Sequence, residues 1–208
     1  MRQLPDFPVQ IYTRKVSGGP NINIYYPHVF HMQNEAMEKF MNQSIVQETQ
    51  SLIDKQIAGA PSAIVEMLGT YEIKNNQRNV LSFTFSNYTY PDKAAHGMTY
   101  LNALTFDLNK GQKCTLNQLF EPESNYLDKL SALIKEQMEE RDIPLINDFA
   151  GIQPDQPFYI ADKTIVIFFQ LYEYTPYAYG FPMFPISVYE LQDIIKEDGP
   201  LGRMAENR

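Results

Sequence analysis

Apolar and polar side chains alternate along this chain with a period that changes several times, and each period predicts a different kind of element. Alternation at every second residue predicts strands over residues 9–16, 21–26, 63–74, 79–90, 98–108 and 112–116. Apolar stripes at helical spacing predict a helix from Asn34 to Gly59 and a second from Ser124 or Asn125 to about Arg141. Runs of strands between single helices are typical of an α+β fold with a mainly antiparallel sheet.

Turn-forming and capping residues mark the ends of the first elements. Residues 17–20 connect the first two strands as a hairpin, and Pro27 is expected to end the second strand. Asn34 is a favourable N-cap, and the Gly-Ala-Pro sequence of residues 59–61 is expected to stop the helix. Gly69 predicts a bulge or bend within a long strand, because glycine in a strand interior commonly marks one.

The predicted strand of residues 79–90 has one apolar and one polar face. A turn is expected before it at residues 75–77, and the strand after it is expected to end in a hairpin loop at residues 109–111. Its apolar face carries Leu81, Phe83 and Phe85, and its polar face carries Ser82, Thr84 and Ser86. This pattern predicts an antiparallel strand with one buried and one exposed face.

Residues 158–186 hold the strongest concentration of apolar and aromatic side chains. Residues 165–171 are apolar on both alternating faces apart from Gln170, which predicts a strand covered on both sides. A buried helix is the alternative interpretation. The β-branched and aromatic composition, together with the turn at Asp162 and Lys163, favours the strand.

The C-terminal part of the chain predicts a third helix. Ser187 and Glu190 have capping-box spacing, with Ile186 and Leu191 placed as a hydrophobic staple, so we expect a helix to about Lys196. Residues 199–208 are expected to form a flexible tail. The whole predicts two sequential halves, residues 1–61 and 62–198, that share one core in one compact structural unit.

Composition and charge narrow the classes of partner. The chain has 208 residues, 44% of them hydrophobic and 20% charged, with a formal charge of −8 and a pI of about 4.9. This acidity argues against nucleic acid and favours a neutral or basic partner. The single cysteine, Cys114, excludes an internal disulfide and a cysteine-based zinc site. No apolar run approaches the roughly 20 residues of a membrane span, and residues 1–8 lack the apolar core of a signal peptide.

The histidines offer little metal chemistry. His28 and His31 are three residues apart in a predicted loop, and no third ligand is indicated nearby, so we expect neither a metal site nor a cofactor. His96 stands in an Ala-His-Gly connection between two strands, close after Tyr90 and next to Gly97. The imidazole of His96 either ties down this loop or contacts a ligand, and both interpretations stay open.

No catalytic motif is recognisable, but an aromatic cluster is. The chain lacks a G-x-S-x-G elbow, a Walker loop, a dinucleotide fingerprint and an H-E-x-x-H pair. Four tyrosines (Tyr172, Tyr174, Tyr177 and Tyr179) crowd a proline- and glycine-containing loop around Glu173. They could form a shelf for a sugar or a protein, and their alternative role is to pack over the core. Glu173 is the acid best placed for chemistry, with a structural hydrogen bond as its alternative role.

Several of these pieces together resemble a known family. Ala95-His96-Gly97 before an aromatic-rich strand, the sequence TFDLNKGQKCTLNQLF, a helix and then FYIADKTIVIFFQLYEYTPYAYGFPMFPISVYEL are similar to the extracytoplasmic domain of the anti-sigma factor RsiV. The same module occurs as the non-catalytic N-terminal part of the peptidoglycan deacetylase PdaC. The resemblance covers residues 9–60 and 80–196.

The resemblance implies a non-catalytic binding domain of the bacterial cell envelope, located outside the cytoplasm. In RsiV this domain binds lysozyme, so a basic protein such as lysozyme, or a cell-wall component, is the implied partner. Two alternatives stay open: a cell-wall glycan hydrolase or deacetylase that uses His96 and an acid such as Glu173, and an intracellular protein of the same fold. The expected ligand-binding residues are Tyr90, His96, Gly97, Tyr172, Glu173, Tyr174, Tyr177 and Tyr179.

Overall fold

The chain folds as two compact units, which we call unit 1 (Met1–Lys113) and unit 2 (Cys114–Arg208). The structure is a computed structural model that describes residues 8–206, so the N-terminal residues on which we based the absence of a signal peptide lie outside it. The expected boundary at residue 61 falls inside unit 1. Within the described residues, no helix is both long and apolar enough to cross a membrane.

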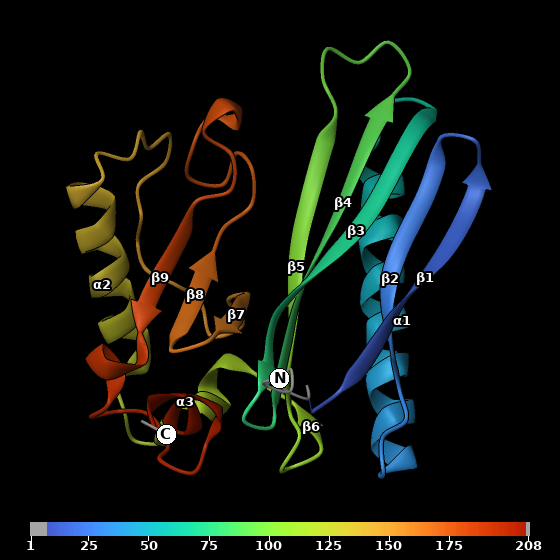
Figure 1. Cartoon of the computed structure of the whole chain (residues 1–208). Helices are drawn as coiled ribbons and strands as arrows, with labels where there is room; N and C mark the ends of the chain where they lie inside the picture. The colour runs from blue at the N-terminus through green and yellow to red at the C-terminus, as the bar shows by residue number, and fades with distance from the viewer. Residues whose placement is uncertain (1–7, 207–208) are drawn as a thin grey trace, which may run out of the picture. The chain divides into compact units, whose positions relative to one another are not determined.

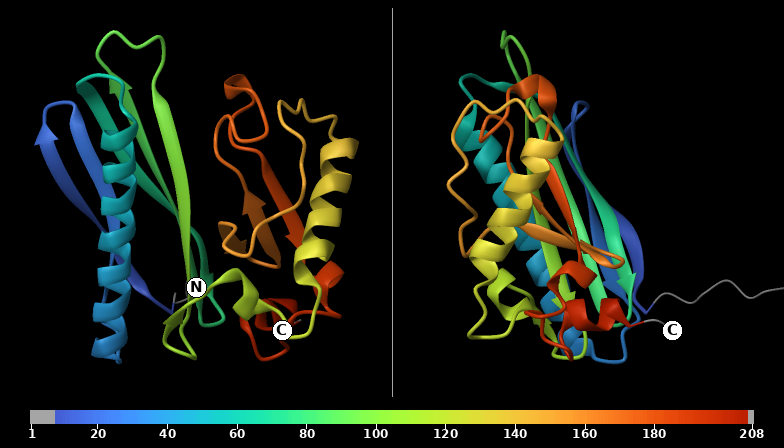
Figure 2. Two further views of the ribbon diagram at one scale, coloured as in Figure 1. Left: turned by 180° about the vertical axis from the view of Figure 1, so that it is seen from behind. Right: turned by 90° about the vertical axis from the view of Figure 1, so that its left-hand side faces the viewer.

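Unit 1 is a six-stranded mixed sheet covered on one face by a long helix (Figures 1 and 2). The strands follow one another in sequence order: β1 (Gln10–Gly19), β2 (Ile22–Phe30), β3 (Ile64–Gln77), β4 (Val80–Pro91), β5 (Met98–Asp107) and β6 (Gln112–Lys113). Only β2 and β3 pair in parallel, and helix α1 (Glu35–Gly59) forms the crossover between them. A parallel pair needs such a crossover, whereas the antiparallel pairs are joined by short connections. The predicted α+β class is therefore confirmed.

Helix α1 forms as its sequence predicts. The Asn34 side chain accepts a hydrogen bond of 3.0 Å from the backbone N–H of Met37, which caps the first turn. The stripe of Met37, Met41, Ile45 and Leu52 is buried against the sheet. The facing sheet residues are Leu81, Phe83, Phe85, Leu104 and Phe106. Because α1 packs on β2, β4 and β5 at once, residues 8–61 and the following strands of unit 1 belong to one core.

Three features of the strands in unit 1 differ from the predictions. Pro27 does not end β2, which continues to Phe30. Beyond Ile24, β2 still pairs with β1 but no longer with β3. The missing N–H of the proline therefore costs no hydrogen bond on the β3 side of the strand. Gly69 is not at a bulge: it pairs with Ile24, and a Cβ on Gly69 would lie 2.7 Å from Ile24 Cγ2. The turn predicted at residues 75–77 falls instead at Arg78 and Asn79, both with positive φ, as two-residue hairpins require.

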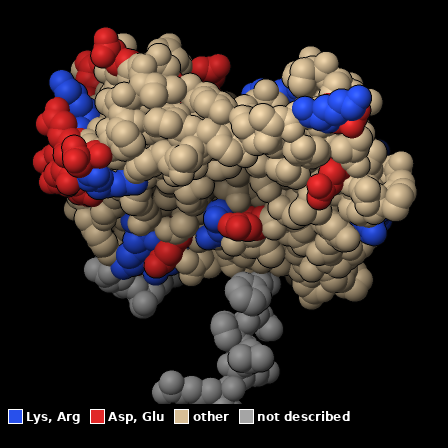
Figure 3. All heavy atoms as spheres, turned by 90° about the horizontal axis from the view of Figure 1, so that it is seen from above, with Lys and Arg blue, Asp and Glu red and all other residues tan. Residues whose placement is uncertain are grey.

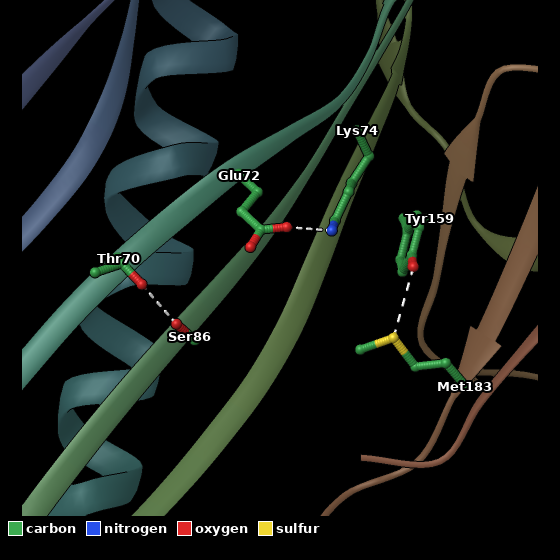
Figure 4. Close-up of polar contacts among 6 residues, drawn as sticks. All are labelled: Thr70, Glu72, Lys74, Ser86, Tyr159 and Met183. Atoms are coloured by element: carbon green, nitrogen blue, oxygen red, sulfur yellow. Dashed lines mark hydrogen bonds and ion pairs between the residues drawn. The ribbon is translucent and has the colours of Figure 1, made fainter. Parts of the chain in front are cut away.

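The half-exposed pattern predicted for β4 is wrong on its polar face. Ser82 and Thr84 are both buried, at 0% and 3% exposed. Burial of Ser82 is tolerated because its hydroxyl finds a partner across the sheet: Ser82 Oγ lies 2.7 Å from Thr105 Oγ1. Further along the strand, Ser86 is less buried and pairs at 2.7 Å with Thr70 of β3, next to the Lys74–Glu72 ion pair (Figure 4).

Unit 2 combines a small antiparallel sheet with helix α2 (Tyr126–Glu140). Its strands are β7 (Phe158–Ala161), β8 (Thr164–Phe168) and β9 (Met183–Ser187), with β8 in the middle. Ile165 and Ile167 on one face and Val166 and Phe168 on the other are at most 5% exposed, as predicted for a strand covered on both sides. The strand ends at Phe168, however, and not at Leu171 as predicted, because the chain turns from residue 171 onward. Figure 4 shows the contact between the hydroxyl of Tyr159 in β7 and the sulfur of Met183 in β9.

The C-terminal segment of unit 2 differs from the prediction. Ser187 and Glu190 do form a capping box, but it opens only a short 3₁₀ helix, Val188–Leu191, and not a helix to Lys196. The residues expected to fray contain helix α3 (Pro200–Ala205), in which Leu201 and Met204 are fully buried. This helix is too short for a periodic signal, and Pro200 and Gly202 lower its apparent helix propensity. The strand predicted at residues 112–116 is limited to β6, after which Leu116–Leu119 forms a 3₁₀ helix.

Candidate functional site

The predicted ligand-binding residues fall into two groups, one in each unit. Tyr90, His96 and Gly97 lie in unit 1: Tyr90 is near the end of β4, and His96 and Gly97 are on the connection from β4 to β5. The five residues around the tyrosine loop lie in unit 2. The expectation that His96 and Tyr177 share one surface stays a prediction, because they belong to different units. The same holds for a catalytic pair of His96 and Glu173.

Hydrogen bonds and close packing shape the β4–β5 connection of unit 1. The Tyr90 hydroxyl donates to the carbonyl of Ala94 at 2.7 Å, and His96 Nδ1 lies 2.9 Å from the carbonyl oxygen of Gly97. A Cβ on Gly97 would stand 2.2 Å from Cε2 of Tyr88, so this position needs glycine for space. Tyr90 and Gly97 therefore hold the connection in shape.

A hollow of about 320 Å³ lies between this connection and the end of α1. Its walls come from Ala60, Pro61, Pro91, Ala94 and Met98, with His96 and Tyr100 at its polar edge. None of the lining residues is Asp, Glu, Lys or Arg. We call this feature the α1-end hollow.

Two deeply buried polar side chains form the floor of the α1-end hollow. Gln56, 2% exposed, donates its side-chain amide to the backbone carbonyls of Asn87 and Met98, the latter at 2.9 Å. Thr89, 1% exposed, donates its hydroxyl hydrogen to Gln56 Oε1 at 2.7 Å. These two residues could not be recognised from the sequence as part of a hollow, because α1, β4 and β5 meet only in the folded chain.

The tyrosine rings on the loop of unit 2 differ in their packing and exposure. Tyr174 packs edge-on against Phe169 and Phe149, with ring centroids 4.9 and 5.4 Å away. Burial raises the pKa of Tyr174, and the nearby charge of Glu173 adds to this. Tyr172 is 45% exposed and lies beside the ring of Tyr177, with centroids 5.6 Å apart. Tyr174 therefore packs against neighbouring rings, whereas the side chain of Tyr172 is exposed.

Backbone hydrogen bonds and an arginine hold the loop in place. Arg141 donates to the Tyr179 hydroxyl at 3.2 Å and to the Met183 carbonyl at 2.8 Å. The Glu173 carboxylate accepts a hydrogen bond of 2.8 Å from the backbone N–H of Gln170, which closes a turn. This is the structural hydrogen bond that we named as the alternative role of Glu173. The Asn147 side chain also donates to the Glu173 carbonyl, at 2.7 Å.

Two exposed aliphatic side chains lie on the segment that is hydrogen-bonded to the tyrosine loop. Leu145 and Ile146 are 44% and 48% exposed, and the backbone N–H of Ile146 donates to the Tyr174 carbonyl at 2.8 Å. We call the group of Leu145, Ile146, Tyr172, Tyr177 and Tyr179 the tyrosine-loop surface. In the sequence, Leu145 and Ile146 are recognisable only as an adjacent pair of apolar residues in a predicted loop.

Acidic side chains surround a hollow beside this surface. The hollow has a volume of about 410 Å³, with an apolar floor of Met138, Ile143 and Phe149. Its charged lining is Lys135 together with Glu139, Asp142 and Asp148. Figure 3 shows acidic side chains gathered at the α2 edge of the face drawn there. The end of α2 is thus acidic although a helix C-terminus favours cations.

The charge of the chain is concentrated in unit 2. Residues 114–208 contain 16 acidic and 7 basic side chains, a net charge of −9, whereas residues 1–113 contain 9 acidic and 10 basic ones, a net charge of +1. Unit 2 therefore carries the acidity that the whole-chain value of −8 reports.

The remaining histidines sit against aromatic rings. His28 lies 4.9 Å from the Tyr12 ring, and burial, with the charge of Arg14 as a smaller cause, lowers its pKa. His31 packs against Phe30 at 4.8 Å. In the part of the chain that the structure describes, no three His, Cys, Asp or Glu side chains are grouped so as to hold a metal ion.

Comparison with known proteins places part of the chain in a family context. The comparison with curated proteins returned no match. A crystal structure of a member of the DUF3298 family from Bacteroides fragilis has a TM-score of 0.71 at 13% identity, covering 97% of this chain and 99% of that one. A DUF3298 family protein from Pseudomonas aeruginosa has a TM-score of 0.66 at 12% identity, covering 98% and 99%. At these identities the likeness concerns the fold alone. Residues 117–189, which hold the tyrosine-loop surface, match the family model described as "Protein of unknown function (DUF3298)".

Proposed function

We propose that this protein is a non-catalytic binding module of the bacterial cell envelope that recognises a basic protein such as lysozyme through unit 2. The observation that carries the proposal is the coincidence, within unit 2, of the tyrosine-loop surface and a net charge of −9. The resemblance to the lysozyme-binding domain of RsiV gives the class of partner.

The composition of the tyrosine-loop surface supports a protein partner. Binding energy at protein interfaces is concentrated in a few residues, and tyrosine is among those most enriched there. Tyr172, Tyr177 and Tyr179 are amphipathic rings on a loop held by backbone hydrogen bonds, so their ordering costs little when a partner binds.

The acidic hollow beside this surface supports a basic partner. Its apolar floor suits the aliphatic stem of a lysine or arginine, while Glu139, Asp142 and Asp148 suit the charged end. The acids at the C-terminal end of α2 oppose the helix dipole, and a bound cation would relieve this. Long-range attraction would speed the encounter and weaken with salt.

The test is calorimetry of the full chain against a panel of lysozymes and size-matched acidic proteins, at low and at physiological salt. We expect binding to basic lysozymes at both salt concentrations, stronger at low salt, and none to the acidic proteins. Absence of heat with every lysozyme, from a sample whose unfolding is cooperative, would contradict the proposal. Equal binding to the acidic proteins would contradict the electrostatic part of it.

A further inference from the structure

We propose that the α1-end hollow of unit 1 is a binding site for a small neutral ligand that presents a secondary amide group. It is a site separate from the tyrosine-loop surface of unit 2 and does not depend on its function. Its volume, about 320 Å³, lies at the lower end of the range of small-molecule sites, which is roughly 300–1,000 Å³.

The absence of charged lining residues selects a neutral ligand. A buried carboxylate or ammonium group needs a counter-charge, and the lining of this hollow contains no Asp, Glu, Lys or Arg. Pro61, Pro91, Ala94 and Met98 give it apolar walls that suit small aliphatic groups. Prolines at two of these positions make those walls stiff.

Among the polar side chains that line the hollow, which also include Gln56 and His96, Thr89 provides an acceptor and Tyr100 a donor. Thr89 gives its only hydroxyl hydrogen to Gln56 Oε1, so Thr89 Oγ1 presents lone pairs to a ligand. Both side-chain amide hydrogens of Gln56 are taken by backbone carbonyls, which fixes the orientation of this pair. Thr89 therefore acts as a preorganised acceptor at the floor.

The donor is the hydroxyl of Tyr100. This oxygen would lie 3.4 Å from a Cβ on Gly59, another lining residue, and it makes no hydrogen bond to any residue of the range 8–206. In the β4–β5 ladder Met98 pairs with Thr89 and Tyr100 with Asn87, so Met98 and Tyr100, two residues apart, share a face. The ring of Tyr100 is steadied by Lys55, whose Nζ lies 4.2 Å from its centroid.

A secondary amide matches this arrangement in chemical terms. Its N–H can donate to Thr89 Oγ1, its C=O can accept from the Tyr100 hydroxyl, and its small apolar substituents can contact the proline, alanine and methionine walls. A hydrocarbon would leave the Tyr100 hydroxyl hydrogen without an acceptor, which costs binding energy.

The experiment is a titration of the full chain, labelled with ¹⁵N, with N-acetylvaline N-methylamide, followed by amide chemical shifts. Two matched probes change only the charge: N-acetylvaline is a carboxylate, and valine N-methylamide is an ammonium. We expect saturable shifts at the side-chain amide of Gln56 and at residues 94–98 with the neutral probe. Each charged probe should bind at least about tenfold more weakly.

Variants separate the polar contact from the cavity. Tyr100→Phe keeps the ring and removes the donor, so the dissociation constant should rise about 2- to 10-fold. Tyr12→Phe, on an exposed tyrosine of β1, is the control and should bind as the wild type does. Gly59→Val fills the hollow at an exposed position and should abolish the shifts. Absence of saturable shifts at the hollow, equal binding of a charged probe, or unchanged binding by both Tyr100→Phe and Gly59→Val would overturn the proposal.

Discussion

Units 1 and 2 differ in where they place charge and aromatic surface. Unit 1 is nearly neutral, and one of its hollows, the α1-end hollow, is lined without Asp, Glu, Lys or Arg. Unit 2 carries a net charge of −9, exposes Tyr172 and Tyr179 on one loop surface and lines its own hollow with three carboxylates and one lysine. The net negative charge of the whole chain therefore comes from only one of its two units. A basic partner is therefore expected to bind to unit 2, and a small neutral ligand is expected to bind to unit 1.

The largest effect is expected in the core of unit 2. Phe168 is fully buried in the central strand β8, so Phe168→Ala should lower the free energy of unfolding by about 3–5 kcal/mol through lost burial and a cavity. Tyr189→Ala, at a side chain that is 43% exposed, is the matched control and should cost less than about 1 kcal/mol. Denaturant unfolding measures both, and equal midpoints would show that Phe168 does not support the core.

The corresponding test in unit 1 concerns the parallel junction of β2 and β3. A methyl group on Gly69 would stand 2.7 Å from Cγ2 of the buried Ile24, so Gly69→Ala should destabilise the protein by about 1–3 kcal/mol. Gly19→Ala would meet no atom within 4 Å, but its φ of 142° also disfavours alanine, so it isolates backbone strain from overpacking. A thermal midpoint of Gly69→Ala within a degree of the wild type would contradict the close approach.

A third comparison concerns the tyrosine-loop surface. Tyr177→Ala or Tyr179→Ala should weaken lysozyme binding by about 1–3 kcal/mol, mainly through faster dissociation, because buried aromatic anchors set the lifetime of a complex. Tyr25→Ala in unit 1 should leave it unchanged. Surface plasmon resonance separates the two rates, and a loss of affinity equal for all three variants would remove the preference for unit 2.

Glu48 gives a smaller effect that depends on pH. Burial raises the pKa of this α1 carboxyl above its ordinary value of 4.5, against smaller opposing effects of the Asn102 hydrogen bond and Lys113. Because the folded protein favours the protonated form, ionisation of Glu48 destabilises it as pH rises from the ordinary pKa through the raised one. Glu48→Gln should therefore gain stability relative to the wild type over that window, by less than about 1 kcal/mol. Unfolding curves from pH 4 to 8 measure the difference, and a gain that is the same at every pH would contradict it.

The smallest effect is expected from single charges at the rim. Asp148→Asn in unit 2 should slow association with a lysozyme by about two- to threefold at low salt, with little change in dissociation. Asp92→Asn, on the β4–β5 connection of unit 1, is the matched control and should change the association rate less. Both differences should shrink at physiological salt. A larger effect of Asp92→Asn would assign the encounter to unit 1.

Periodicity was sufficient to predict the long elements. Helix α1 with its Asn34 cap, strands β4 and β5, helix α2 and the two-sided burial of β8 all follow from apolar spacing. Such patterns are reliable because one face of each element is fixed by the core over many residues.

The failures have local causes. Pro27 continues β2 because its free side has no strand to pair with at that point, and this depends on where β3 diverges. The capping box at Ser187 opens a 3₁₀ helix of four residues, since a cap fixes where a helix begins and not how far it extends. The hollow of unit 1 could not be predicted because Gln56, Thr89 and Tyr100 come from three different elements.

The assignment of lysozyme binding to unit 2 is tested most directly by hydrogen exchange of the full chain with and without a basic lysozyme. Slower exchange is expected within residues 145–149 and 172–180 of unit 2, with no change around the α1-end hollow at residues 56–61 and 89–100. Protection confined to unit 1, with unit 2 unchanged in the saturated complex, would contradict the assignment of the binding surface to the acidic, tyrosine-rich unit.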